Sequence, residues 1–129
     1  MGHTGCVANL LPADFDLTLL PHSEQRVCKA FLLGLDDTWS VIPNVPLLVD
    51  GGDSEIDVVL VSPNHGVIVV EVKGGVIAIE QGRWVQNGHV LAKSPAQQVT
   101  KAKHNLLKRL RSAGIDMADM FVCHAIALP

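Results

Sequence analysis

The chain contains few cysteines, few aromatic residues and no long apolar segment. Its 129 residues include three cysteines, two tryptophans, three phenylalanines and no tyrosine. The cysteines are odd in number and far apart, so they form neither a disulfide framework nor a CxxC pair, which is typical of the reducing cytoplasm. Charged or turn-forming residues interrupt every apolar run before it reaches membrane-spanning length, so we expect no association with a membrane. The first residues also lack the basic and apolar regions of a signal peptide.

Positive charge is scarce and unevenly distributed. The net charge is −3 and the pI is about 6.0, which excludes a globally basic nucleic-acid binder and leaves only a local patch for such contacts. No Lys or Arg occurs between Lys29 and Lys73, where the charged residues are all acidic. Five of the ten basic residues then crowd into one segment, as Lys101, Lys103, Lys108, Arg109 and Arg111. Two interpretations stay open: solvated faces of a small protein, or an acidic cation site beside a phosphate-binding helix.

Apolar residues are abundant and regularly spaced. They make up 48% of the chain, which excludes disorder over most of the length and fits a single domain. Their spacing predicts helices over 23–35 and 94–112, and strands over 41–49, 56–61, 67–73, 76–80, 83–86, 89–92 and 121–128. Residues 1–19 are predicted to be an irregular arm, because Pro12, Asp14 and Asp16 disfavour regular elements. Residues 20–129 form the domain, which we expect to be the N-terminal part of a longer chain.

Three charged residues, Asp57, Glu71 and Lys73, interrupt the two most apolar strands. Both faces of these strands carry Val, Ile or Leu, so both are expected to be covered, and a buried charge there needs a partner. Pairing the strands across the intervening loop puts Val59 opposite Val69 and Asp57 opposite Glu71. This register places Asp57, Glu71 and Lys73 on one face, whereas a shift of one residue would separate Asp57 from the other two.

Two neighbouring carboxylates repel each other unless one is protonated or a cation lies between them. Mg²⁺ prefers oxygen ligands and keeps several waters, so Asp57, Glu71 and the backbone carbonyl of Val72 form a candidate metal site. Lys73 would then lie beside the attacking water and the incoming phosphate, where it orients the water and stabilises charge on phosphorus. The alternative is a buried ion pair of Lys73 with Glu71 or Asp57 that performs no chemistry.

The two predicted helices offer further candidates. Glu24 lies one turn before Val27 and Cys28, on the apolar side of the first helix, from where its carboxylate can reach the sheet and hold a water. The alternative is a simple interaction of Glu24 with the helix dipole. Gln98 and Lys101 lie one turn apart near the start of the second helix, where free N–H groups favour phosphate. The alternative for Gln98 is a solvated amide, and the alternative for Lys101 is a charge on a soluble helix face.

Four segments carry a more specific signal: SEQRV at 23–27, EIDVVL at 55–60, GVIVVEVKG at 66–74 and SPAQQ at 94–98. Together they resemble the nuclease-related domain (NERD), a family of the PD-(D/E)XK nuclease superfamily, over about residues 20–128. The resemblance implies an α+β fold with an αβββαβ restriction-endonuclease-like core, in which helices flank a mixed sheet. One departure is Ile56, which stands where the superfamily name has proline.

The resemblance also implies roles for individual residues. Asp57 and Glu71 would bind Mg²⁺ or Mn²⁺, Lys73 would be catalytic, and Glu24 would be a supporting acid. A helix glutamine, Gln98 or its neighbour Gln97, completes the set.

These inferences lead us to expect a metal-dependent nuclease that hydrolyses DNA phosphodiester bonds in the cytoplasm, in DNA repair or processing. Lys101 and Gln98 would contact the DNA, and a helicase module in the same protein is the expected partner. The alternative is a non-catalytic DNA-binding or assembly module that keeps the nuclease-like fold.

Overall fold

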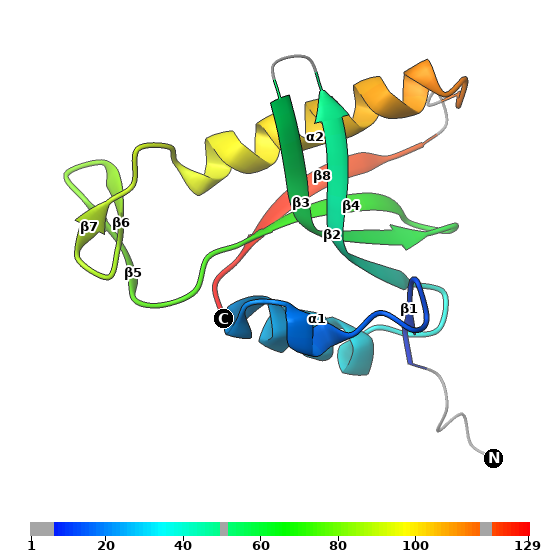
Figure 1. Ribbon diagram of the computed structural model, residues 1–129, viewed down its shortest axis with the longest axis horizontal. Helices are drawn as coiled ribbons and strands as arrows, with labels where there is room; N and C mark the ends of the chain where they lie inside the picture. Colours follow the sequence, from blue (N-terminus) through cyan, green and yellow to red (C-terminus); the bar gives the residue numbers. More distant parts are fainter. Residues whose placement is uncertain (1–6, 50–51, 117–119) are drawn as a thin grey trace.

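A computed structural model describes residues 7–49, 52–116 and 120–129. Its centre is a mixed five-stranded sheet in the order β1-β2-β3-β4-β8, with a helix on each side (Figure 1). The described elements are β1 (Asn9–Leu10), the 3₁₀ helix η1 (Leu17–Leu19), α1 (His22–Gly34), β2 (Ser40–Val49), β3 (Gly52–Ser62), β4 (Gly66–Val72), β5 (Ile77–Glu80), β6 (Arg83–Gln86), β7 (His89–Val90), α2 (Pro95–Ser112) and β8 (Val122–Ala127). None of the helices in these residues is long and apolar enough to span a membrane.

The predicted order of helix, strands, helix and strand is confirmed, and the sheet is mixed as expected. β2, β3 and β4 are antiparallel neighbours, whereas β8 pairs with β4 in parallel. The predicted bounds differ from the observed ones by at most one residue, with two exceptions: β7 ends at Val90 instead of residue 92, and β3 begins at Gly52 instead of residue 56. Residues 50 and 51 lie outside the described residues.

Residues 7–19 are more regular than predicted. β1 pairs in parallel with β2, and the Asn9 N–H donates to the Trp39 carbonyl at 2.9 Å. η1 is capped by Asp16, whose side chain accepts a hydrogen bond from the Thr18 N–H. The prediction of an irregular arm is therefore wrong for this part. Asp16 disfavours a helix interior but caps a short one, because its carboxylate satisfies a free N–H, and Ala8 adds a buried contact to the core.

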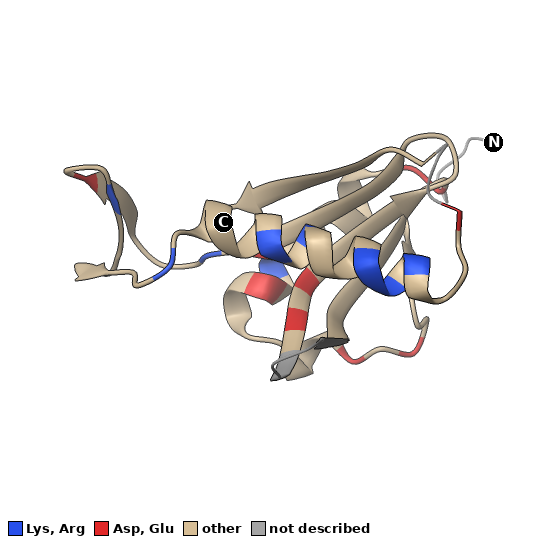
Figure 2. Cartoon of the chain, turned by 90° about the horizontal axis from the view of Figure 1, so that it is seen from above, with Lys and Arg blue, Asp and Glu red and all other residues tan. Residues whose placement is uncertain are grey.

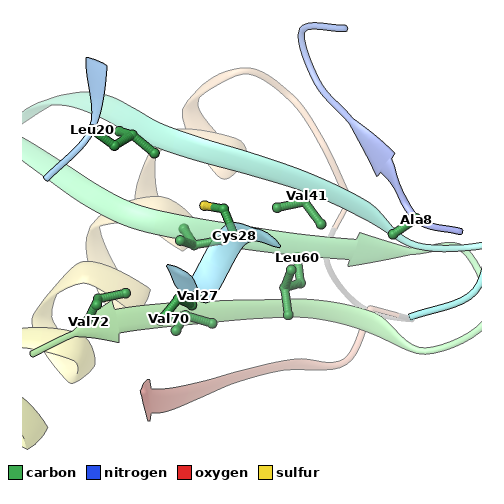
Figure 3. Close-up of a cluster of buried hydrophobic side chains, with 9 residues drawn as sticks. Ala8, Leu20, Val27, Cys28, Val41, Leu60, Val70 and Val72 are labelled. Atoms are coloured by element: carbon green, nitrogen blue, oxygen red, sulfur yellow. The ribbon is translucent and has the colours of Figure 1, made fainter. Parts of the chain in front are cut away.

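Both faces of the sheet are covered by apolar side chains, as the sequence predicts. One cluster lies beneath α1 and includes Ala8, Leu20, Val27, Cys28, Val41, Val58, Leu60, Val70 and Val72. Figure 3 shows Val27 and Cys28 reaching from α1 onto the sheet residues Leu60 and Val70. The other cluster lies beneath α2 and includes Leu47, Ile56, Val59, Val67, Val69, Val99, Ala102 and Leu106. A charged group at this sheet therefore lies between two apolar layers and is costly without a partner.

The β3–β4 register is the one expected over most of the hairpin, where Val59 pairs with Val69. The ladder ends at Val58 opposite Val70, so the expected pair of Asp57 with Glu71 is not part of it. At Asp57 the strand then changes face. Alternation would put Ile56 on the same face as Val58, yet Ile56 packs in the cluster beneath α2 and Val58 in the one beneath α1. The opposite strand has a matching irregularity at Asn44, whose φ of 54° lies in the left-handed region. Asp57 thus sits at a local rotation of β3.

A second, three-stranded sheet of β5, β6 and β7 lies to one side of the main sheet (Figure 1). We call it the meander. It is inserted between the end of β4 and the start of α2, and Asn87 and Gly88 form the predicted β6–β7 turn with φ values of 50° and 84°. Positive φ at both positions matches the twist of a two-residue hairpin. The meander therefore follows β4, which carries Glu71, after a short connection that begins with Lys73.

Candidate active site

Asp57 lies where β3 and β4 separate. One step beyond the last β3–β4 pair, its Oδ2 atom accepts a hydrogen bond from the Val72 N–H at 2.9 Å. The side chain satisfies the N–H group that a regular antiparallel ladder would give to a backbone carbonyl. The carboxylate is thereby held between the two strands at the open end of the hairpin.

Glu71 on β4 and Lys73, the residue just after β4, form an ion pair. The Lys73 Nζ atom lies 3.4 Å from Glu71 Oε1, and the two side chains are 19% and 14% exposed. Burial raises the pKa of Glu71, and the negative charge of Asp57 raises it further, whereas Lys73 lowers it. The expected meeting of Asp57, Glu71 and Lys73 is thus present in the structure. The ion pair alone is also what a purely structural role would show.

Glu24 reaches the same place from the first turn of α1. Desolvation and then the charges of Asp57, Glu71 and Glu55 raise its pKa from 4.5 to about 7. Cys28, one turn further along α1, is fully buried, and desolvation with Glu24 and Asp57 raises its thiol pKa to about 11. α1 therefore carries an acid toward the site and buries its thiol as core.

Glu55 is an acid that the sequence reasoning missed. It is exposed on β3, two residues before Asp57, and its charge contributes to the raised pKa of Glu24. Its place in the EIDVVL segment beside Asp57 was the signal in the sequence, although alternation could not assign its face because β3 rotates at Asp57. Glu55 adds to the negative potential around Glu24.

The backbone carbonyl of Val72 is also directed at the site. The Lys73 N–H donates to the Ala127 carbonyl of β8 at 3.0 Å, whereas the Val72 N–H donates to Asp57 on the opposite edge. In an extended strand the N–H and C=O of one residue point to the same edge, so the Val72 carbonyl faces the side of Asp57.

Of the two helix glutamines, Gln97 is used to cap α2. Its Oε1 accepts from the Ser94 N–H at 3.4 Å, and its own N–H donates to Ser94 Oγ at 3.0 Å, which completes a capping box. Gln98 is different, because its Oε1 is buried and has no hydrogen-bond partner among the described residues. A buried acceptor without a donor costs about 1–3 kcal/mol. That unmet acceptor favours Gln98 over Gln97 as the helix glutamine of the site.

Lys101 occupies a different surface. It is exposed and lines an open groove of about 500 Å³ on α2 with Ala96, Gln97, Thr100 and His104. None of the acids of β3 and β4 lines this groove. Figure 2 shows Lys and Arg spaced along α2, with Asp and Glu on other elements. The structure thus brings Asp57, Glu71, Lys73 and Glu24 together and leaves Lys101 on the adjoining helix surface.

The donor set can be compared with what a metal ion requires. Among the residues whose positions are described, no three His, Cys, Asp or Glu side chains are close enough to hold a metal ion. Mg²⁺ needs fewer, because proteins often bind it through one or two carboxylates while waters and substrate phosphates complete the shell. Asp57, Glu71 and the Val72 carbonyl are such a set, and a cation would relieve the repulsion that raises the pKa of Glu71. These residues therefore fit Mg²⁺ or Mn²⁺.

The sequence matches the family model of the nuclease-related domain over residues 22–129. The chain belongs to the nuclease-related domain family. The match runs from α1 to beyond β8, so it includes every residue of the site described above. No match was found among curated proteins or among solved structures. The mixed sheet between two helices agrees with the restriction-endonuclease-like core expected for this nuclease-related domain.

Proposed function

We propose that this nuclease-related domain is a metal-dependent nuclease that hydrolyses phosphodiester bonds in DNA. One observation carries the proposal. Asp57, the Glu71–Lys73 ion pair and Glu24 come from three different elements and meet where β3 and β4 separate. A stabilising ion pair needs one acid and one base, whereas this group has a surplus of acids, and two of them, Glu24 and Glu71, have raised pKa values. Such a surplus is typical of functional sites.

Asp57, Glu71 and the Val72 carbonyl would hold the ion. When bound, Mg²⁺ or Mn²⁺ would polarise the phosphate and lower the pKa of the attacking water. Asp57 would be held in place for this purpose by the hydrogen bond that its Oδ2 accepts from the Val72 N–H. Removing either carboxylate would remove half of the charged ligands.

Lys73 would stabilise the charge that builds on the phosphate. Its ammonium is mostly buried beside Glu71, and a preorganised cation in a partly dry site is more effective than one in water. Glu24 has a pKa of about 7, so in the metal-free protein it is partly ionised at neutral pH and can accept a proton from water. The buried Gln98 Oε1 would accept a hydrogen bond from that water or from another donor of the substrate complex.

DNA is the proposed substrate, and Lys101 would contact its backbone from the groove on α2. Family membership supports a place in DNA repair or processing, with a helicase module in the same protein as partner. Cys28 and Cys123 are free thiols, which supports the cytoplasm as the compartment.

Plasmid nicking tests the proposal. Supercoiled DNA is incubated with the domain in Mg²⁺, in Mn²⁺ and in EDTA, and binding is measured in parallel in Ca²⁺. Nicking that requires the metal supports the nuclease. Binding without nicking in any metal would support the alternative, a non-catalytic DNA-binding or assembly module.

A further inference from the structure

The segment directly after Lys73 leaves the main sheet and is held by the meander. Three hydrogen bonds define this attachment. The Gln86 Nε2 donates to the Gly74 carbonyl at 2.8 Å, the Val76 N–H donates to Asn87 Oδ1 at 2.9 Å, and the Asn87 N–H donates to the Val76 carbonyl at 2.8 Å. The strand that ends at the site is therefore continued by a backbone whose position is set by β6 and its turn.

Packing around two glycines shows how tight this attachment is. A Cβ atom on Gly74 would lie 2.6 Å from the Cβ of Ser23, in the first turn of α1. A Cβ on Gly75, whose φ is +80°, would lie 2.6 Å from Asn87 Oδ1. Gly74 thus lies between the meander and the turn of α1 that carries Glu24. The connection after β4, the meander and α1 therefore meet at Gly74.

Lysine carries its ammonium on a flexible stem, so the position of the Lys73 ammonium is set by the ion pair with Glu71 together with the backbone from which the stem starts. On the β8 side the Lys73 N–H is held by the Ala127 carbonyl. On the other side, the carbonyl of the next residue is held by the part-buried amide of Gln86. Loss of this donor would leave a half-buried carbonyl without its partner and release the backbone at the end of β4.

We propose that Gln86 is a positioning residue for Lys73: its amide holds the Gly74 carbonyl and so fixes the backbone from which Lys73 reaches Glu71. The inference rests on the proposed nuclease function and goes beyond it, because it assigns the meander a part in the reaction. In the proposed role, Gln86 contacts neither the acids of the site nor the substrate. It acts only through Gly74.

The test compares Gln86→Glu and Gln86→Leu with His89→Ala. Glutamate keeps the shape of Gln86 but, when ionised, has no N–H donor, and leucine removes the polar group. His89 is the exposed cross-strand partner of Gln86 on β7 and serves as the control. Both Gln86 variants should lower kcat by about tenfold or more. A misplacement of about 1 Å costs roughly 100-fold, which is the upper end of the expected loss. KM should stay within about twofold, and His89→Ala should behave as the wild type.

Amide hydrogen exchange supplies a second measurement that does not need turnover. In Gln86→Glu, protection should fall at Val76 and Asn87, whose N–H groups make the other two hydrogen bonds of the attachment, and remain at the central β3 and β4 amides. A variant with wild-type kcat would overturn the positioning role while leaving the nuclease function intact. A wild type without turnover would instead refute the nuclease function and the positioning role with it. Unchanged exchange at Val76 and Asn87 would show that Gln86 does not hold this segment.

Discussion

The raised pKa of Glu24 predicts how the metal-free protein responds to pH. The folded-state pKa is about 7, against an ordinary value of 4.5. Below about pH 4.5 Glu24 is protonated in both the folded and the unfolded chain, so it adds no difference. Between pH 4.5 and 7 the unfolded chain loses this proton while the folded protein keeps it, and the free energy of unfolding falls. Above pH 7 the loss is complete.

The magnitude follows from the same two values. A rise from 4.5 to about 7 corresponds to at most about 3 kcal/mol. Because Glu24 is only partly buried, solvent screening reduces this to about 1–2 kcal/mol. The pKa of Glu71 is also raised, so it adds to the pH dependence in the same direction. The effect of Glu24 is therefore the difference between wild type and Glu24→Gln.

Urea unfolding in EDTA at pH 5 and pH 7.5 measures this difference. Wild type should lose about 1–2 kcal/mol more than Glu24→Gln between the two values. Glu55→Gln is the matched control, since Glu55 makes the smallest of the three charge contributions to the pKa of Glu24, and it should lose nearly as much as wild type. Equal losses in wild type and Glu24→Gln would show that Glu24 is not held in a desolvated, negative environment.

Three further perturbations have defined outcomes. Mg²⁺ at about 100 times its dissociation constant should stabilise the wild type by about 2.7 kcal/mol in thermal or urea unfolding. Asp57→Asn should remove most of that gain. An equal gain in the variant would indicate general charge screening. Lys101→Ala should reduce the slope of log DNA-binding constant against log salt, measured in Ca²⁺, by about one unit. Arg111→Ala, at the far end of α2, should leave that slope unchanged. Equal slopes for wild type and Lys101→Ala would remove Lys101 from the DNA interface. Ser94→Ala should cost about 1 kcal/mol in urea unfolding, because it removes the Oγ that accepts from the Gln97 N–H, while the bond from the backbone N–H of residue 94 to Gln97 Oε1 stays possible. An unchanged midpoint would contradict the cap.

Much of the fold could be predicted because its residues follow simple periods. Alternation of Val and Ile fixed the pairing of Val59 with Val69, since a shift of one residue would turn every apolar side chain to the wrong face. The second helix was predicted over 94–112, and α2 runs over Pro95–Ser112 with Ser94 as its N-cap. These signals are local, and the structure uses them directly.

The rotation of β3 at Asp57 could not be read from alternation. It moves Ile56 to the α2 side while Val58 stays on the α1 side, and it coincides with the left-handed Asn44 of β2. Asn44 lies between two prolines, Pro43 and Pro46, and proline inside a strand often marks an irregular ladder. The hydrogen bond from the Val72 N–H to Asp57 depends on this rotation, so it was out of reach of the sequence.

The helix candidates were separated only by the structure. In the sequence Gln97 and Gln98 are adjacent and equivalent. The capping box uses Gln97, whereas the Oε1 of Gln98 is buried without a partner. Lys101 was expected beside Gln98, one turn along the helix, yet it lines the outer groove with Gln97. Small differences in helical angle decide between a buried and an exposed position.

The central claim is that Asp57 and its neighbours form a metal-dependent hydrolytic site. The most direct measurement is single-turnover cleavage of supercoiled DNA in Mg²⁺ by wild type, Asp57→Asn and Asp37→Asn. Asp37 is an exposed aspartate in the turn between α1 and β2, so it controls for loss of one negative charge. The wild type and Asp37→Asn should cleave at similar rates, and Asp57→Asn should be slower by about 100-fold or more, as expected when a group that stabilises the transition state is lost. Equal rates for all three proteins, or cleavage that persists in EDTA, would contradict the account.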